Sequence, residues 1–89
     1  MGNRLEWVSH SYRGMFVHAL AFEVVEIGRQ TSPPGQKWGY LVEIRFSAQP
    51  DEEPVYAPSL EDYFTRAAAE QAAFHYGRGA IDLFLAAPP

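Results

Sequence analysis

Residues 38–48 read WGYLVEIRFSA, and this stretch decides the fold. Successive side chains of a β-strand point to opposite faces of its sheet, so every second residue shares a face. One face of this stretch is apolar and aromatic: Trp38, Tyr40, Val42, Ile44 and Phe46. The other face includes Glu43 and Arg45. The alternation predicts a half-buried strand whose aromatic face lies against a core.

The preceding stretch, residues 15–27, reads MFVHALAFEVVEI and also predicts a strand, but one that is apolar on both faces. One face carries Phe16, His18, Leu20, Phe22 and Val24, and the other carries Val17, Ala19, Ala21, Val25 and Ile27. Residues 30–36 between the strands have the composition of an exposed turn or loop, which predicts an antiparallel hairpin. A single helix covers only one face of this strand. The second face needs a partner, or the N-terminal segment 5–12 folded over it.

Residues 58–87 predict one long C-terminal helix. Ser59 is a suitable N-cap, and Glu61 and Asp62 complement the helix dipole in the first turn. Helical spacing predicts a stripe facing the sheet: Leu60, Phe64, Ala67, Gln71 and Phe74.

Gly77 and Gly79 leave two readings of the C-terminal region open. The helix ends there with a glycine cap, and residues 81–85 form a strand, or the helix continues. Ile81 and Leu85 extend the apolar series, which favours a helix to about Ala86.

Together these elements predict an α+β fold, in which an antiparallel β-hairpin or a three-stranded sheet packs against the C-terminal helix. A third strand would come from the N-terminal arm or from Val55-Tyr56. The whole of residues 1–89 is expected to be a single domain, with an arm at 1–12, the sheet at 13–57 and the helix at 58–87.

Composition and charge narrow the function classes. A net charge of -4 weighs against duplex DNA or an anionic membrane as partner. The absence of cysteine excludes disulfides, thiolate metal sites and a cysteine nucleophile. No apolar run is long enough to span a bilayer and no signal peptide is evident, so the expected location is cytoplasmic.

No constellation in the sequence predicts catalysis or metal binding. His10, His18 and His75 lack the spacing of metal ligands, so no metal and no cofactor is expected. None of the serines lies in a Gly-x-Ser-x-Gly context, and the acidic residues at 51–53 and 61–62 fall in exposed segments. We therefore expect a protein that is not an enzyme.

Three motifs in order resemble those of small uncharacterised bacterial β-β-α proteins. They are Tyr12-Arg13-Gly14, the segment that begins at Trp38, and the segment from Ala73 to Asp82 containing Gly-Arg-Gly-Ala-Ile-Asp. The resemblance covers residues 12–83 and implies that the region from Gly77 to Asp82 is helical. A weaker resemblance is to HicB-type antitoxins, which also begin with a hairpin followed by a helix, although the glycine-rich segment expected between strand and helix is missing.

The functional hypothesis is a non-catalytic interaction or regulatory module that self-associates, with a homodimer as the expected state and another protein as an alternative partner. The residues expected at the association surface are Val17, Ala19, Val25 and Ile27, or Tyr63 and Phe84 on the outer helix face. The competing hypothesis is a site for single-stranded nucleic acid or a small apolar ligand, with Trp38 and Tyr40 as stacking residues.

Overall fold

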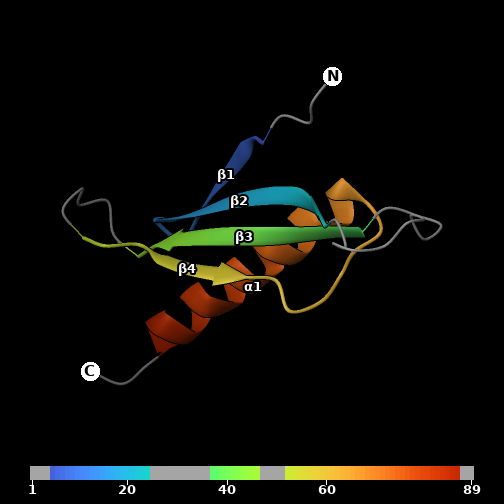
Figure 1. The fold of residues 1–89 in the computed structure, drawn as a ribbon. Helices are drawn as coiled ribbons and strands as arrows, with labels where there is room; N and C mark the ends of the chain where they lie inside the picture. Colours follow the sequence, from blue (N-terminus) through green and yellow to red (C-terminus); the bar gives the residue numbers. More distant parts are fainter. Residues whose placement is uncertain (1–4, 25–36, 47–51, 87–89) are drawn as a thin grey trace, which may run out of the picture.

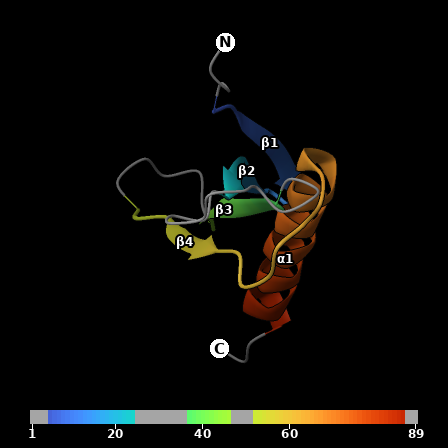
Figure 2. The same ribbon diagram turned by 45° about the vertical axis from the view of Figure 1, so that its right-hand side comes forward.

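The computed structural model describes residues 5–24, 37–46 and 52–86. Its elements in chain order are β1 (Trp7–Tyr12), β2 (Met15–Val24), β3 (Lys37–Arg45), β4 (Val55–Pro58) and α1 (Arg66–Ala86). The strands form one antiparallel sheet in the order β1-β2-β3-β4, and α1 lies across its far face in Figure 1. Figure 2 shows the resulting two layers from the side. The predicted α+β fold is confirmed, and both candidate sources of a third strand contribute one.

The core lies between α1 and one face of β2 and β3. The register pairs Val17 with Ile44, Ala19 with Val42 and Ala21 with Tyr40, and all six side chains are at most 7% exposed. Trp38 and Phe46 pack at the margin of this core. The aromatic face predicted from the alternation in residues 38–48 is therefore the core face.

The helix covers the face of β2 that carries Val17 and Ala19, both 0% exposed. This corrects the prediction that placed these two residues at an association surface, because no partner can reach them in this fold. Val25 and Ile27 lie outside the described residues. The face carries small side chains, so α1 can approach β2 closely, and at Gly77 an added Cβ would press against both methyl groups of Val17.

The helix begins at Arg66, seven residues after the predicted cap. Thr65 is the N-cap, and its Oγ1 accepts a hydrogen bond from the Ala68 N–H at 3.0 Å. Ser59 instead pairs with β3: its N–H donates to the Tyr40 carbonyl at 2.8 Å, and its Oγ accepts from the Tyr40 N–H at 3.0 Å. Tyr63 and Trp38 also exchange backbone hydrogen bonds. The prediction that Ser59 caps the helix is wrong because Ser59 extends the edge of the sheet.

The predicted helical stripe is also wrong: of its five residues only Phe74 is buried, and Ala67 and Gln71 lie on exposed positions of α1. Leu60 and Phe64 precede the helix and are 97% and 76% exposed. The residues of α1 that are buried against the sheet are Ala69, Ala73, Phe74, Gly77 and Ile81. The helix continues through both glycines to Ala86, as the apolar series predicts. Within the part of the chain that the structure describes, no helix is both long enough and apolar enough to cross a membrane.

The N-terminal segment extends the sheet. β1 joins β2 through a two-residue turn at Arg13 and Gly14, whose φ angles are 51° and 80°. Positive φ at both central positions is the geometry that matches the twist of a tight hairpin. Because β1 pairs with the edge of β2, it does not fold over the second face of the sheet as one alternative proposed.

Candidate functional site

The face of the sheet opposite α1 is covered by none of the described residues, and Figure 1 looks directly onto it. We call it the uncovered face. Register and strand alternation place these apolar side chains on it: Trp7, Phe16, Leu20, Phe22, Leu41 and Tyr56. Trp7 is 46% and Tyr56 54% exposed, and Phe16 is 38% exposed. An apolar surface from four adjacent strands is therefore open on the side away from the helix.

Phe22 and Gly39 show that this face is packed across its strands. The two residues are paired in the β2–β3 register, and a Cβ at Gly39 would lie 3.0 Å from the ring atom Cε1 of Phe22. The aromatic ring therefore occupies the space that a side chain at position 39 would need. Leu20 and Leu41, the next apolar pair on this face, are likewise half-buried.

Polar side chains form a cluster at the centre of the uncovered face. His18 Nδ1 lies 2.5 Å from Ser9 Oγ, and its Nε2 lies 3.7 Å from Glu43 Oε1. Arg45 Nε donates to the same Glu43 oxygen at 3.0 Å, and the Tyr56 hydroxyl also donates to this carboxylate. The charges of Glu43 and Arg45 thus cancel within the face.

Glu43 is held in its ionised form. Burial acts to raise its pKa, but the hydrogen bonds from Tyr56 and Arg45 outweigh that effect, so the pKa of Glu43 is lowered. The same bond raises the pKa of the Tyr56 hydroxyl, because ionisation would place two negative charges together.

Ser9, His18 and Glu43 have the residue types of a serine hydrolase triad, but their geometry differs from one. The Glu43 carboxylate lies 3.7 Å from the imidazole, beyond hydrogen-bond distance, and its contacts are with Arg45 and Tyr56. It therefore does not orient His18 as the acid of a triad orients its histidine. Among the described residues no three His, Asp or Glu side chains are grouped as metal ligands.

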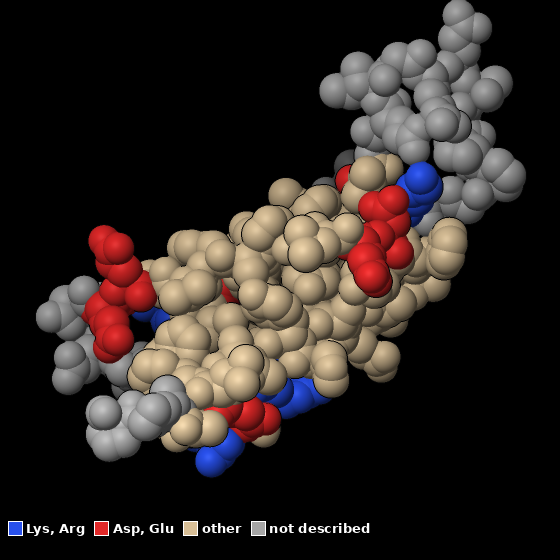
Figure 3. Space-filling model, turned by 90° about the horizontal axis from the view of Figure 1, so that it is seen from below, with Lys and Arg blue, Asp and Glu red and all other residues tan. Residues whose placement is uncertain are grey.

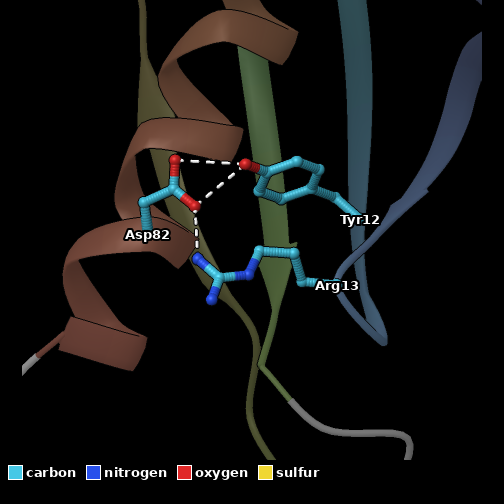
Figure 4. A network of polar contacts seen from close by, with 3 residues as sticks. All are labelled: Tyr12, Arg13 and Asp82. Atoms are coloured by element: carbon cyan, nitrogen blue, oxygen red, sulfur yellow. Dashed lines mark hydrogen bonds and ion pairs between the residues drawn. The ribbon is translucent and has the colours of Figure 1, made fainter.

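A second polar network joins the β1–β2 turn to the C-terminal half of α1 (Figure 4). The Tyr12 hydroxyl donates to Asp82 Oδ1 and Oδ2 at 2.9 and 3.1 Å, and Arg13 Nη1 donates to Oδ1 at 2.8 Å. Hydrogen bonds from Arg13 and then Tyr12 lower the pKa of Asp82, and the bond to Asp82 raises the pKa of Tyr12. This network anchors the hairpin to the helix.

The two residues predicted to stack on bases lie on the helix side of the sheet. Tyr40 is 7% exposed, and burial raises the pKa of its hydroxyl. Trp38 is half-buried and packs against the same core. The Tyr40 ring is therefore closed to a stacking base, and Trp38 is only partly exposed.

Of the two residues predicted for the outer helix face, Tyr63 precedes α1 and packs against the core, whereas Phe84 lies on α1 and is exposed. The Tyr63 ring centroid is 6.0 Å from that of Tyr40, and the Phe84 centroid is 4.6 Å from that of Phe46. Phe84 is still 52% exposed, and its neighbour Leu83 is 75% exposed. In the view of Figure 3, uncharged residues make up most of the surface, with acidic side chains towards both ends and a mixed group of acidic and basic side chains along the lower edge.

The sequence did not predict that the apolar residues of the uncovered face would form the open surface of the molecule. The available signal was that the second face of β2 carries larger side chains, Phe16, Leu20 and Phe22, than the face with Val17 and Ala19. A helix packs closely on the smaller set and leaves the larger one open. This distinction becomes visible only once the helix position is known.

Comparisons with protein-family models, with curated proteins and with solved structures found no match for this chain. The resemblance to small bacterial β-β-α proteins stays a prediction. The arrangement of side chains on the uncovered face therefore carries the functional argument.

Proposed function

We propose that this protein is a non-catalytic interaction module that self-associates through the uncovered face, with two copies packed sheet to sheet. The observation that carries the proposal is the character of β2. Three of its outward side chains, Phe16, Leu20 and Phe22, are apolar. An antiparallel sheet that faces water normally presents polar residues there, so the outward side of β2 has the composition of a buried strand.

A second copy of the chain suits this surface because the uncovered face is electrically balanced. Glu43 and Arg45 neutralise each other within it, so two copies meet without net repulsion. A nucleic acid would gain little binding energy from this face, because Arg45 is already paired with a carboxylate and is not available to a backbone phosphate. Two sheets with the same right-handed twist also pack face to face in the aligned arrangement of β-sandwiches.

Assembly through the β4 edge is disfavoured by proline. Along an antiparallel strand, every second residue directs its backbone N–H and C=O to the neighbouring strand. Ser59 donates to the Tyr40 carbonyl, so Val55 and Ala57 also direct their backbone groups to β3. Tyr56 and Pro58 direct theirs outward, and Pro58 has no N–H to donate. Proline on an outer strand is a common protection against edge-to-edge pairing. The open face therefore offers the better route to a dimer.

The uncovered face is large enough for a modest interface. The four strands have 6, 10, 9 and 4 residues, and at about 3.4 Å per residue and about 4.8 Å between strands they span roughly 470 Å². A standard interface buries about 800 Å² per partner, so we expect a dimer whose population depends on protein concentration.

Sedimentation velocity over a range of protein concentrations tests this proposal. The wild-type chain should approach twice its mass of 10.0 kDa as concentration rises. Leu41→Glu places an unpaired charge among the half-buried apolar residues of the uncovered face and should hold the protein at the mass of the monomer. Trp7→Arg, at an exposed position of the same face, should weaken association without placing a charge in a half-buried site.

Leu83→Glu is the matched control. It makes the same chemical change at a residue of α1 that is 75% exposed and away from the uncovered face, so it should leave the dimer intact. Circular dichroism checks that each variant is folded. A monomeric wild type at every concentration, or Leu83→Glu dissociating as readily as Trp7→Arg, would overturn the proposal.

A further inference from the structure

A groove of about 640 Å³ lies on the helix side of the molecule, away from the uncovered face. Its lining includes His10 from β1, Tyr63 from the segment before α1, and Gln71, Phe74, His75 and Arg78 from α1. This volume falls within the range of small-molecule sites, which is about 300–1,000 Å³.

The apolar part of the groove contains a pair of stacked rings. The rings of His10 and Phe74 are stacked with centroids 3.7 Å apart and planes 8° from parallel. Ala68 and Ala72 also line the groove, and their small side chains leave room beside the helix. A planar apolar group can therefore lie against the aromatic and alanine side chains without displacing a long flexible one.

Apart from the Tyr63 phenol, every ionisable side chain that lines the groove is a histidine or an arginine. His10, His75 and Arg78 line it, and no carboxylate does. In a chain of net charge -4, a site free of acidic side chains is a local departure from the average surface. Such a lining favours an anion over a neutral or cationic ligand.

Arg78 provides a second, independent observation. The other lysine and arginine side chains that the structure describes each face a carboxylate, in the pairs Arg13–Asp82, Lys37–Asp62, Arg45–Glu43 and Arg66–Glu70. Within residues 5–24, 37–46 and 52–86, Arg78 alone among them forms no ion pair. It is half-buried at the groove, so its guanidinium donors are available there to a ligand.

We propose that this groove binds a small anionic ligand, namely a carboxylate or phosphate group carried on an aromatic body. Arg78 donates to the anion in a bidentate contact, and His75 lies beside it on the next turn. The aromatic body packs against the outer face of the His10 ring, which is itself stacked on Phe74, and against the alanines. This site is separate from the proposed dimer surface, so the two proposals stand or fall independently.

Ligand titrations followed by two-dimensional NMR on the 10.0 kDa chain test the proposal. The probes are benzoate and phenyl phosphate, with benzamide as the uncharged analogue and inorganic phosphate as the anion without a ring. We expect benzoate or phenyl phosphate to perturb resonances of His10, His75 and Arg78, and to bind at least tenfold more tightly than benzamide or inorganic phosphate. The two anionic probes distinguish a carboxylate ligand from a phosphate ester.

Arg78→Gln should weaken binding of the better probe at least tenfold. Arg66→Gln is the matched control, because it removes the same charge from the same helix at a residue that does not line the groove. Glutamine preserves helix propensity at both positions, and circular dichroism verifies the fold. Benzamide binding as tightly as benzoate, equal losses in the two variants, or no saturable binding by either anionic probe would overturn the proposal.

Discussion

Gly77 and Gly79 lie two positions apart in α1, but only Gly77 packs closely against another element. At Gly77 an added Cβ would lie 2.9 Å from Val17 Cγ2 and closer still to Cγ1, so glycine is what allows α1 to approach β2. At Gly79 an added Cβ would meet nothing within 4 Å. Each glycine costs a helix up to about 1 kcal/mol relative to alanine, and only at Gly77 does close packing offset that cost.

Replacing the two glycines separately tests this difference. Gly77→Ala should lower the free energy of unfolding by about 1–3 kcal/mol, because the methyl group overpacks against Val17. Gly79→Ala should raise it by about 0.5–1 kcal/mol through helix propensity alone. Urea denaturation measures both values. Equal effects of the two substitutions would show that α1 does not approach β2 as closely as described.

At the scale of elements, the start of α1 depends on a competition between two good capping residues. Ser59 and Thr65 both have the hydroxyl that an N-cap needs. Ser59 is engaged by Tyr40, and Tyr63 by Trp38, so the chain follows the edge of β3 until Thr65. The helix begins after Thr65, beyond the residues that pair with β3.

Removing the Thr65 hydroxyl tests this assignment. Thr65→Ala should lower the free energy of unfolding by about 1 kcal/mol, because the Ala68 N–H loses its acceptor. Thr65→Asp should retain or improve stability, since it keeps an acceptor and complements the helix dipole. Thermal or urea denaturation followed by circular dichroism distinguishes them. If Thr65→Ala matches the wild type, Thr65 is not the cap.

At the scale of the whole molecule, the Tyr12–Arg13–Asp82 network joins parts of the chain about 70 residues apart. Asp82 has a pKa below its ordinary value because Arg13 and Tyr12 donate to its charged form. A carboxyl whose pKa is lower in the folded state stabilises the fold above its unfolded pKa, about 3.9 for Asp. That stabilisation is lost as pH falls through the folded pKa.

Acid titration of stability tests the role of this anchor. Asp82→Asn should be less stable than the wild type at pH 7, and the difference should narrow below about pH 4 as the wild-type carboxyl protonates. Arg13→Asn accepts the φ of 51° and removes only the guanidinium, so it should shift the acid response in the same direction. Urea midpoints at pH 7 and pH 3 give the comparison. A gap between wild type and Asp82→Asn that stays the same at both pH values would contradict a lowered Asp82 pKa.

The sequence by itself determined the α+β class, the core face of β3 and the continuity of α1 through its glycines. These features follow from alternation and helical spacing, which are local in the chain. Tertiary structure decided which face of β2 lies under the helix, because both faces are apolar and only the close approach at Gly77 selects the smaller one. It also decided where α1 begins, because the pairing of Ser59 and Tyr63 with β3 removes one of two equivalent caps. The candidate surface depends on both choices: it is the face that remains after the helix has packed on the other.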